Sequence, residues 1–193
     1  MREFILLALK ARTDDFALDK TEAGLVCRTV SNALWMSKGV RKDTIIHVVL
    51  NGPPSPPKTV SFYGKDMIGG GFDEQSIMGM LKISLEKGAK LTLHQQVESQ
   101  PGIVVAKESF EALVQQKAAT NQLIYLHPRG EDIRSFNFVQ NPTFILGDLF
   151  GIPKNTEHLL KRLGAMRVKL GPHMLFASHC PIIVHNELDR REK

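Results

Sequence analysis

Runs of apolar, largely β-branched residues alternate along the chain with segments in which apolar positions recur at helical spacing. Residues 2–9 and 44–50 form two such runs, continuous enough for strands that are covered on both faces. Between them, residues 20–37 carry apolar side chains on one face of a predicted helix, with Asp19 and Glu22 spaced as a capping box. This alternation is typical of an α/β protein.

Proline and glycine punctuate the middle of the chain. The turn NGPPSPPK ends the second strand, and the connection is so short that the next strand, residues 59–63, is predicted to be antiparallel. Gly69-Gly70-Gly71 is interpreted as a plain loop, because no GK[ST] follows it as in a phosphate-binding loop. Three further elements are predicted: a helix from Asp73 or Glu74, a strand at 103–105 after the Pro101-Gly102 turn, and a helix at 107–119.

Three predicted strands in the last third of the chain each end in a loop that contains glycine or proline. The strands are 123–126, 143–146 and 166–170, and they end at His127-Pro128, Gly147-Asp148 and Gly171-Pro172. Helices are predicted from Pro153 to residue 163 and over 178–190. Ligands of open parallel sheets bind beyond the carboxyl ends of strands, so these loops predict a pocket. GDLFG lacks the GxGxxG spacing, so no dinucleotide site is predicted.

Composition limits the class of protein without identifying it. The 193 residues, 42% apolar and 23% charged, suit one soluble domain with a full core. The apolar start is too short for a membrane span and has no signal-cleavage site, so we expect a cytoplasmic protein. Cys27 and Cys180 belong to no CxxC pair, which predicts reduced thiols and no zinc site. The net charge of +5 permits a polyanionic partner without requiring one.

Long motifs in a fixed order carry a resemblance to a known family. They are MREFIL at the start, Cys27-Arg28, RKD at 41–43, NGPPSPP, PGI at 101–103, IYLHPRGEDI, NPTFILGDLFGI and SHCPIIVHNELD. With these motifs the chain resembles the archaeal tRNA pseudouridine N1-methyltransferase family (TrmY) and its bacterial relatives, within the SPOUT superfamily. The resemblance implies an α/β fold whose parallel-rich sheet is flanked by helices and whose C-terminal part forms a deep trefoil knot. It also implies a homodimer and one domain over residues 1–193, with the knotted cofactor-binding part at about 123–193.

The cofactor of the resembling family is S-adenosylmethionine, bound by the knotted loops. The cofactor-binding residues that the resemblance implies are Leu126, Gly147, Leu170, Met174, Leu175 and Cys180. The resemblance implies direct methyl transfer to N1 of a pseudouridine, expected in the T-loop of a tRNA. Such a displacement needs alignment of the reacting atoms and removal of one proton, but no metal. A covalent cysteine adduct would instead suit carbon methylation, so Cys180 is expected to line the pocket.

The base and the RNA contacts are less well defined. The candidate bases are Asp66, Asp132 and Asp148, each of which is equally typical of a turn or cap. The candidate phosphate contacts are Arg28, Lys38, Arg41 and Lys42, for which plain surface charge is the alternative. Asn32, where the family pattern often carries an acidic residue, and the HPR triplet at 127–129 depart from that pattern, so the resemblance defines the cofactor site more closely than the substrate contacts.

Several alternatives stay open at this point. His179 and His185 lie six residues apart, which points them in different directions on a helix and predicts no metal site. The same cofactor pocket would also serve another RNA target, such as ribosomal RNA or a ribose 2′-hydroxyl. A non-catalytic RNA-binding or assembly factor is the alternative from another class, because no general base stands out. The RNA target, the modified position, the base and catalytic activity itself are beyond the sequence.

Overall fold

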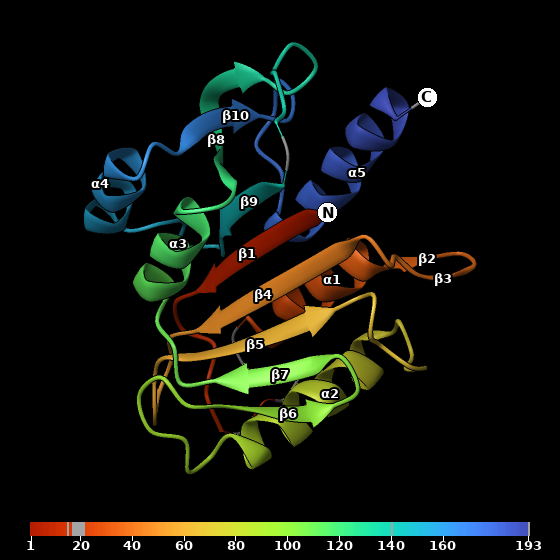
Figure 1. The fold of residues 1–193 in the computed structure, drawn as a ribbon, viewed down its shortest axis with the longest axis vertical. Coiled ribbons are helices and arrows are strands. Elements are labelled where there is room, and N and C mark those ends of the chain that lie inside the picture. The colour runs from red at the N-terminus through yellow and green to blue at the C-terminus, as the bar shows by residue number, and fades with distance from the viewer. Residues whose placement is uncertain (15, 17–21, 140, 193) are drawn as a thin grey trace.

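A mixed sheet of eight strands organises the fold (Figure 1). The computed structural model describes residues 1–14, 16, 22–139 and 141–192. In sheet order the strands are β10 (Met166–Lys169), β8 (Gln122–Asp132), β9 (Pro142–Gly147), β1 (Arg2–Ala8), β4 (Thr44–Leu50), β5 (Lys58–Tyr63), β7 (Ile103–Ala106) and β6 (Gln96–Gln100). Neighbours from β10 to β4 run parallel, and β5, β7 and β6 extend the sheet antiparallel. The short strands β2 (Trp35–Met36) and β3 (Gly39–Val40) form a separate hairpin.

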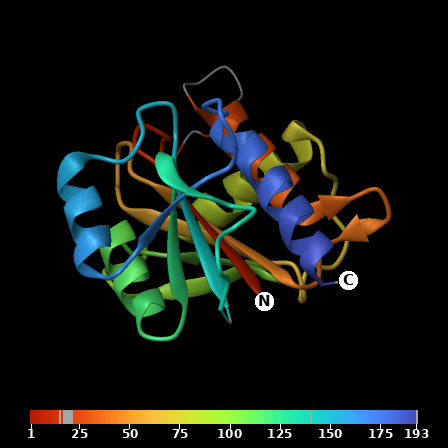
Figure 2. The same cartoon turned by 90° about the horizontal axis from the view of Figure 1, so that it is seen from above.

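Helices cover both faces of this sheet (Figures 1 and 2). They are α1 (Ala23–Leu34), α2 (Glu74–Lys87), α3 (Phe110–Ala118), α4 (Lys154–Arg162) and α5 (Cys180–Arg191), the last preceded by the 3₁₀ turn η1 (Ala177–His179). The apolar residues of α1, α2 and α5 belong to one buried cluster, and those of α3 and α4 belong to another. Sheet and helices therefore form three layers. No helix of the described residues is long and apolar enough to cross a membrane.

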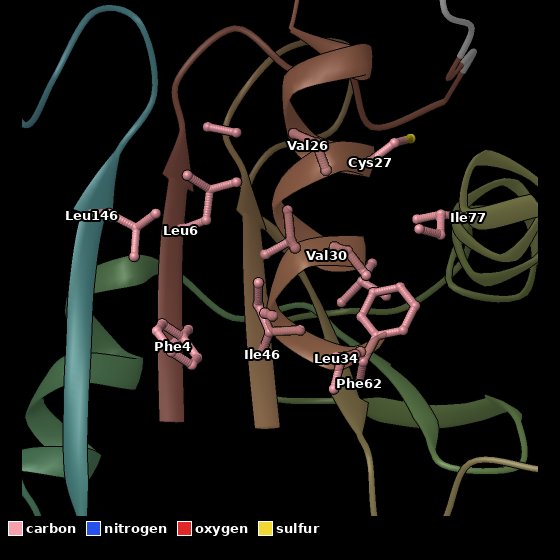
Figure 3. Close-up of a cluster of buried hydrophobic side chains, with 14 of the residues drawn as sticks. Phe4, Leu6, Val26, Cys27, Val30, Leu34, Ile46, Phe62, Ile77 and Leu146 are labelled. Carbon is pink, nitrogen blue, oxygen red and sulfur yellow. The ribbon is translucent and has the colours of Figure 1, made fainter. Parts of the chain in front are cut away.

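The central strand β1 shows why the sequence favours this layering. All of its residues are buried, and successive side chains point to opposite faces of the sheet. Phe4 and Leu6 pack towards α1, while Ile5 and Leu7 pack on the side of α3 and α4. Figure 3 shows Phe4 and Leu6 beside Val30 of α1 and the neighbouring strands. A strand buried on both faces needs a continuous apolar run, which is the pattern of residues 4–9.

Most predicted elements are confirmed. Strand β4 spans residues 44–50 as predicted, and β5 pairs with it antiparallel, with Ile45 opposite Tyr63. The helix after the glycine loop begins where the sequence placed it, because the carboxylate of Asp73 accepts the backbone N–H of Ser76 at 2.9 Å. Pro153 caps α4 from one position before its first helical residue. Asp19 of the predicted capping box lies outside the described residues.

Other expectations are wrong for identifiable reasons. The strand at 123–126 does not end at His127-Pro128: β8 continues to Asp132. Its register with β10 jumps between Arg167 and Val168, from Tyr125 to Glu131, so residues 126–130 bulge out of the ladder. Helix α1 ends at Leu34, earlier than predicted, because the next residues enter the β2–β3 hairpin. The unpredicted strand β6, QVESQ, is largely exposed and polar at the sheet edge, which leaves no apolar alternation in its sequence.

Candidate functional site

A cleft opens at the bulge of β8 and beyond the carboxyl ends of β9 and β10, and we call it the strand-end cleft. It consists of two adjoining cavities of about 280 Å³ and about 80 Å³. Its walls include all the residues expected to bind a cofactor: Leu126, Gly147, Leu170, Met174, Leu175 and Cys180. Leu126, Met174 and Cys180 border both cavities. The fold thus brings together residues that lie up to 54 positions apart in the sequence (180 − 126), while their contact with a cofactor stays a prediction.

The floor of the strand-end cleft is a backbone turn that only glycine permits. A Cβ atom at Gly147 would lie 2.6 Å from the carbonyl carbon of Gly151, closer than real Cβ contacts. Gly151 itself has φ 72°, in the left-handed region that glycine adopts without strain. Asp148 and Gly151 close the turn with a β-bridge. Gly147 is therefore required by this close approach, and Gly151 is required by its left-handed backbone conformation.

Apolar side chains stand at the rim of the strand-end cleft. Met174 is 81% exposed and Leu175 is 37% exposed, and both line its cavities. Phe176 follows them with 62% of its surface exposed, and Leu149 and Phe150 are exposed on the opposite loop. Large apolar side chains held in solvent around a cavity are typical of a surface that a ligand or another chain covers. The rim can bury the apolar parts of a bound molecule.

A pair of buried carboxyl groups lies beneath this cleft. Asp148 lines the larger cavity, and its carboxylate accepts the backbone N–H groups of Leu9 and Phe150. Glu22 approaches it from the start of α1 and accepts the backbone N–H of Lys10 at 3.3 Å. Burial, the hydrogen bond to Asp148 and repulsion by its charge raise the pKa of Glu22 to about 7. Glu22 therefore keeps its proton up to about neutral pH, and the two backbone N–H groups hold the carboxylate of Asp148 in place.

Replacing Glu22 by glutamine is expected to stabilise the protein at alkaline pH. The folded state keeps a proton on Glu22 that the unfolded state releases above its ordinary pKa of 4.5, so wild-type stability falls as pH rises from about 4.5 to about 7. The glutamine amide donates to Asp148 without titrating. Urea unfolding at pH 8 is expected to show a gain of up to about 3 kcal/mol for the variant, which vanishes at pH 4.

The matched control for this prediction is Glu86→Gln, because Glu86 is an exposed residue of α2. Its stability difference from the wild type is expected to be small and the same at both pH values. A Glu22→Gln variant that is as stable as the wild type at pH 8 as well as at pH 4 would contradict the raised pKa of Glu22.

The three candidate bases lie in different environments. Asp148 borders the strand-end cleft, whereas Asp132 follows the bulge and is held by Arg134, whose guanidinium lies 2.9 Å from its carboxylate. This bond lowers the pKa of Asp132 well below its usual range, which makes it a poor proton acceptor. Asp66 lies in the turn after β5, beside the first residues of β4 and therefore at the opposite end of the sheet. Of the three, the fold favours Asp148.

The environment of Cys180 fits a pocket residue better than a nucleophile. Its side chain is buried at the first turn of α5, where Sγ donates to the carbonyl oxygen of Phe176 at 3.5 Å. Burial raises the pKa of the Cys180 thiol to about 11, so the reactive thiolate is scarce at neutral pH. Cys27 lies in the main core, where burial raises its thiol pKa to about 12. Neither thiol is activated.

Replacing Cys180 by alanine is expected to leave turnover within about tenfold of the wild type. The substitution removes a packed side chain, but it removes no covalent step of the reaction. Transfer of a labelled methyl group to RNA measures this. Iodoacetamide at pH 8 should leave the folded wild type unmodified, with urea-unfolded protein as the reactive control. Loss of all turnover in a variant that still binds cofactor would instead assign a covalent role to the thiol.

Most of the side chains predicted to contact phosphate form ion pairs or hydrogen bonds with other residues of the chain. Arg28 pairs with Glu74 at 2.9 Å, and Arg41 pairs with Asp189 at 2.6 Å. The amino group of Lys42 donates to the carbonyl oxygen of Met67 at 3.0 Å. Arg28 turns towards α2 and Arg41 towards α5, so these cations do not form one patch. Lys38, exposed at the turn of the β2–β3 hairpin, makes no ion pair with another described residue.

Two further polar residues have structural roles. Asn32 donates its side-chain amide to the carbonyl oxygen of Ser178 at 2.7 Å, which joins α1 to the segment before Cys180. A carboxylate at that position could not donate, so the departure from the family pattern has a local reason. His185 is buried and bonds to Arg2 and to the carbonyl oxygen of Ala33, and burial lowers its pKa to about 4. Among the described residues, no group of side chains suits a metal ion.

A second polar group, which no sequence motif predicts, lies beside the strand-end cleft. Glu157 of α4 accepts the hydroxyl of Tyr125 at 2.7 Å, and Arg167 of β10 lies 3.4 Å from the same carboxylate. His127 is 3.9 Å from Glu157. These side chains come from three separate elements, so no local motif could have revealed them.

Comparison with known proteins finds similar chains over the whole length of the sequence. A family model described as "Putative SAM-dependent RNA methyltransferase" matches residues 1–193. A protein of Photobacterium profundum named "Putative pseudouridine methyltransferase" is 37% identical over 195 residues, which is 98% of each chain. A protein of the same name from Vibrio parahaemolyticus is 35% identical over 198 residues and 100% of each chain.

Solved structures share the fold. Nep1 of Archaeoglobus fulgidus, bound to S-adenosylhomocysteine, has a TM-score of 0.59 at 13% identity, covering 90% of this chain and 73% of Nep1. The SpoU methyltransferase AviRb of Streptomyces viridochromogenes, in complex with AdoMet, has a TM-score of 0.51 at 12% identity, covering 98% of this chain and 57% of AviRb. At such low identities the likeness concerns the fold alone.

Proposed function

The chain belongs to a family of S-adenosylmethionine-dependent RNA methyltransferases, and from this premise we propose that it methylates N1 of a pseudouridine in the T-loop of tRNA. The strand-end cleft carries the proposal, because every residue expected to bind the cofactor lines it. The names of the relatives support the nucleoside. We further propose that the chain acts in the cytoplasm as one domain over residues 1–193.

The lining of the cleft suits the proposed cofactor. Leu126, Met174 and Leu175 would offer apolar surface to its adenine ring, and the backbone of residues 126–130, which leaves the ladder with β10, would offer polar groups to the ring edge. The close approach at Gly147 leaves room for a ligand against the backbone. The bound cofactor supplies a methyl group on a sulfonium centre. The chain's own task is to align the nucleoside with that group and to exclude water.

Within this proposal, Asp148 takes the proton from the nucleoside nitrogen. It is the candidate aspartate that borders the cleft, and two backbone N–H groups fix its carboxylate. Glu22, whose pKa is raised to about 7 by burial and by Asp148, lies beside this carboxylate. A pH profile of turnover tests this role: Asp148→Asn is expected to flatten it, and an unchanged profile would contradict the assignment.

Two experiments separate the cofactor from the substrate. Calorimetry with S-adenosylmethionine is expected to show binding, and a folded protein without binding would contradict the proposed site. Turnover of labelled cofactor on tRNA should disappear on pseudouridine-free RNA. Mass spectrometry of nucleosides from a deletion strain names the product: loss of another methylated species would favour ribosomal RNA or a ribose hydroxyl. RNA binding without any turnover would favour the assembly-factor alternative.

We propose that the active form is a homodimer, as the resemblance implies. Ile182 and Ile183 on α5 are 49% and 37% exposed, and they follow the exposed rim residues Met174 and Phe176 in the chain. This apolar set, next to the strand-end cleft, is the surface that a second copy would cover. Light scattering at micromolar concentration is expected to give twice the mass of one chain, and a monomer would contradict the proposal.

We also propose the trefoil knot within residues 123–193. After β10 at the sheet edge, the chain returns past the strand-end loops to α5, which packs on α1 over the other half of the sheet (Figure 2). This return across the parallel strands supports a threaded chain. Pulling on both termini tests it, because a knotted chain stops short of about 3.3–3.6 Å for each residue. Extension to the full length would contradict the knot.

A further inference from the structure

A second cleft lies on the α4 side of the sheet, and we call it the α4 cleft. It has a volume of about 570 Å³ and lies between α4 and the strands β8 and β10. Its basic lining residues are Lys154, His158 and Lys161 of α4 together with Arg167 of β10. Neither the sequence motifs nor the strand-end cleft accounts for this group of side chains.

Helical spacing places the α4 residues in one row. Lys154, His158 and Lys161 follow each other at intervals of four and three, so they share a face of the helix. All are exposed, and the row spans about 10 Å at 1.5 Å per residue. Phosphates of one duplex strand follow each other at about 3.4 Å along the axis, so this row can face several of them.

The charge of the row is available to a ligand. Lys154 and Lys161 make no ion pair with any other residue that the structure describes. Arg167 is oriented into the group by Glu157 at 3.4 Å and remains 46% exposed in its side chain. In contrast, Arg28 and Arg41 of the sequence-predicted set are each paired with a carboxylate of the chain. Free cations in a concave surface favour a polyanion over solvent.

The α4 cleft adjoins the strand-end cleft. Tyr125 and Glu157 line both, and the hydroxyl of Tyr125 donates to Glu157 at 2.7 Å. The ring of His127, at the rim of the strand-end cleft, lies 5.2 Å from that of Tyr125. An RNA strand held along α4 would therefore pass next to the strand-end cleft, where the proposed function places the methyl group.

We propose that the α4 cleft binds the phosphate backbone of the RNA substrate through Lys154, Lys161 and Arg167. The inference rests on the RNA substrate of the proposed function and adds the surface that holds it. Backbone contacts of this kind position the strand and carry no sequence information, which suits a site beside the reaction centre. The carboxylate of Glu157 lies 3.4 Å from the guanidinium of Arg167 and orients it. Glu157 is therefore a positioning residue for this surface.

The test compares two charge reversals of equal size. Lys154→Glu with Lys161→Glu reverses both lysine charges of the row. The matched control is Lys82→Glu with Lys90→Glu, which changes the half-buried Lys82 of α2 and the exposed Lys90 that follows this helix. Anisotropy of labelled unfractionated tRNA is recorded at two salt concentrations. The α4 variant is expected to bind on the order of tenfold more weakly, with a salt slope shallower by about 2. The control variant is expected to change both far less.

Calorimetry with S-adenosylmethionine distinguishes the possible failures and serves as the folding check, with Lys154→Gln and Lys161→Gln as milder variants. An α4 variant that binds both cofactor and tRNA like the control variant overturns the inference alone. A wild type that binds the cofactor but no tRNA overturns the substrate assignment and this surface with it. Inorganic phosphate and a mononucleotide serve as competitors: displacement of tRNA by either at stoichiometric concentration would identify a small-anion site and overturn the backbone assignment.

Discussion

Replacing Gly147 by alanine is expected to lower methyl transfer by about 10²-fold, because misplacement of a site by about 1 Å has that effect. The new Cβ atom would meet the carbonyl carbon of Gly151 at 2.6 Å and its Cα at 2.9 Å. Backbone cannot yield as a flexible side chain does, so the 148–151 turn must shift and carry Asp148 with it. Calorimetry with S-adenosylmethionine and turnover on tRNA measure the loss.

Gly171 provides a control within the same cleft. It also lines the cavity, but a Cβ atom there meets no other atom within 4 Å. Gly171→Ala is therefore expected to keep cofactor affinity and turnover close to the wild type. Equal losses in the two variants would show that the cleft tolerates no added methyl group anywhere, and wild-type behaviour of Gly147→Ala would refute the close-approach argument.

Replacing Arg2 by methionine is expected to lower the free energy of unfolding by about 3 kcal/mol, the lower end of the cost of breaking a buried ion pair. The Arg2 side chain is 4% exposed and reaches Asp189 at 2.6 Å and Glu192 at 2.8 Å, which ties β1 to the end of α5. The lower end applies because both acids are partly exposed and can return to water. Urea unfolding measures the change.

The matched control is Arg134→Met. Arg134 makes a similar contact, with Asp132 at 2.9 Å, but its side chain is 79% exposed, so the expected loss is below about 1 kcal/mol. Equal losses in the two variants would contradict the role of burial. Arg41 and Arg2 also lower the pKa of Asp189 to about 2, so its contribution is present above its ordinary pKa of 3.8 and is lost as pH falls towards 2. The Arg2→Met variant should lose part of that acid sensitivity.

The contrast between β4 and β6 shows what local pattern can predict. The run at 44–50 is apolar apart from Thr44 and His47, because this strand is covered on both faces, and its bounds follow directly from the sequence. Strand β6 forms at the edge through backbone pairing with β7, and its polar side chains report nothing of that pairing. Strands buried by the core are therefore readable from sequence, while edge strands held by backbone bonds are not.

The two clefts differ in the same way. The residues of the strand-end cleft follow strand ends and lie in long motifs, so their sequence neighbourhood already indicated a pocket, and the resemblance supplied its cofactor. The α4 cleft joins Tyr125, the 154–161 row and Arg167, which no local spacing connects. Likewise, the sequence around Arg41 does not predict its ion pair with Asp189 of the terminal helix.

The sequence by itself determined the α/β alternation, the buried strands and the strand-end loops, because these depend on hydrophobic periodicity and on glycine and proline geometry within a few residues. Only the tertiary structure decided which charges are free and which are paired, since that depends on residues far apart in the chain. It also decided the 126–130 bulge, because a register jump arises between two strands and not within one.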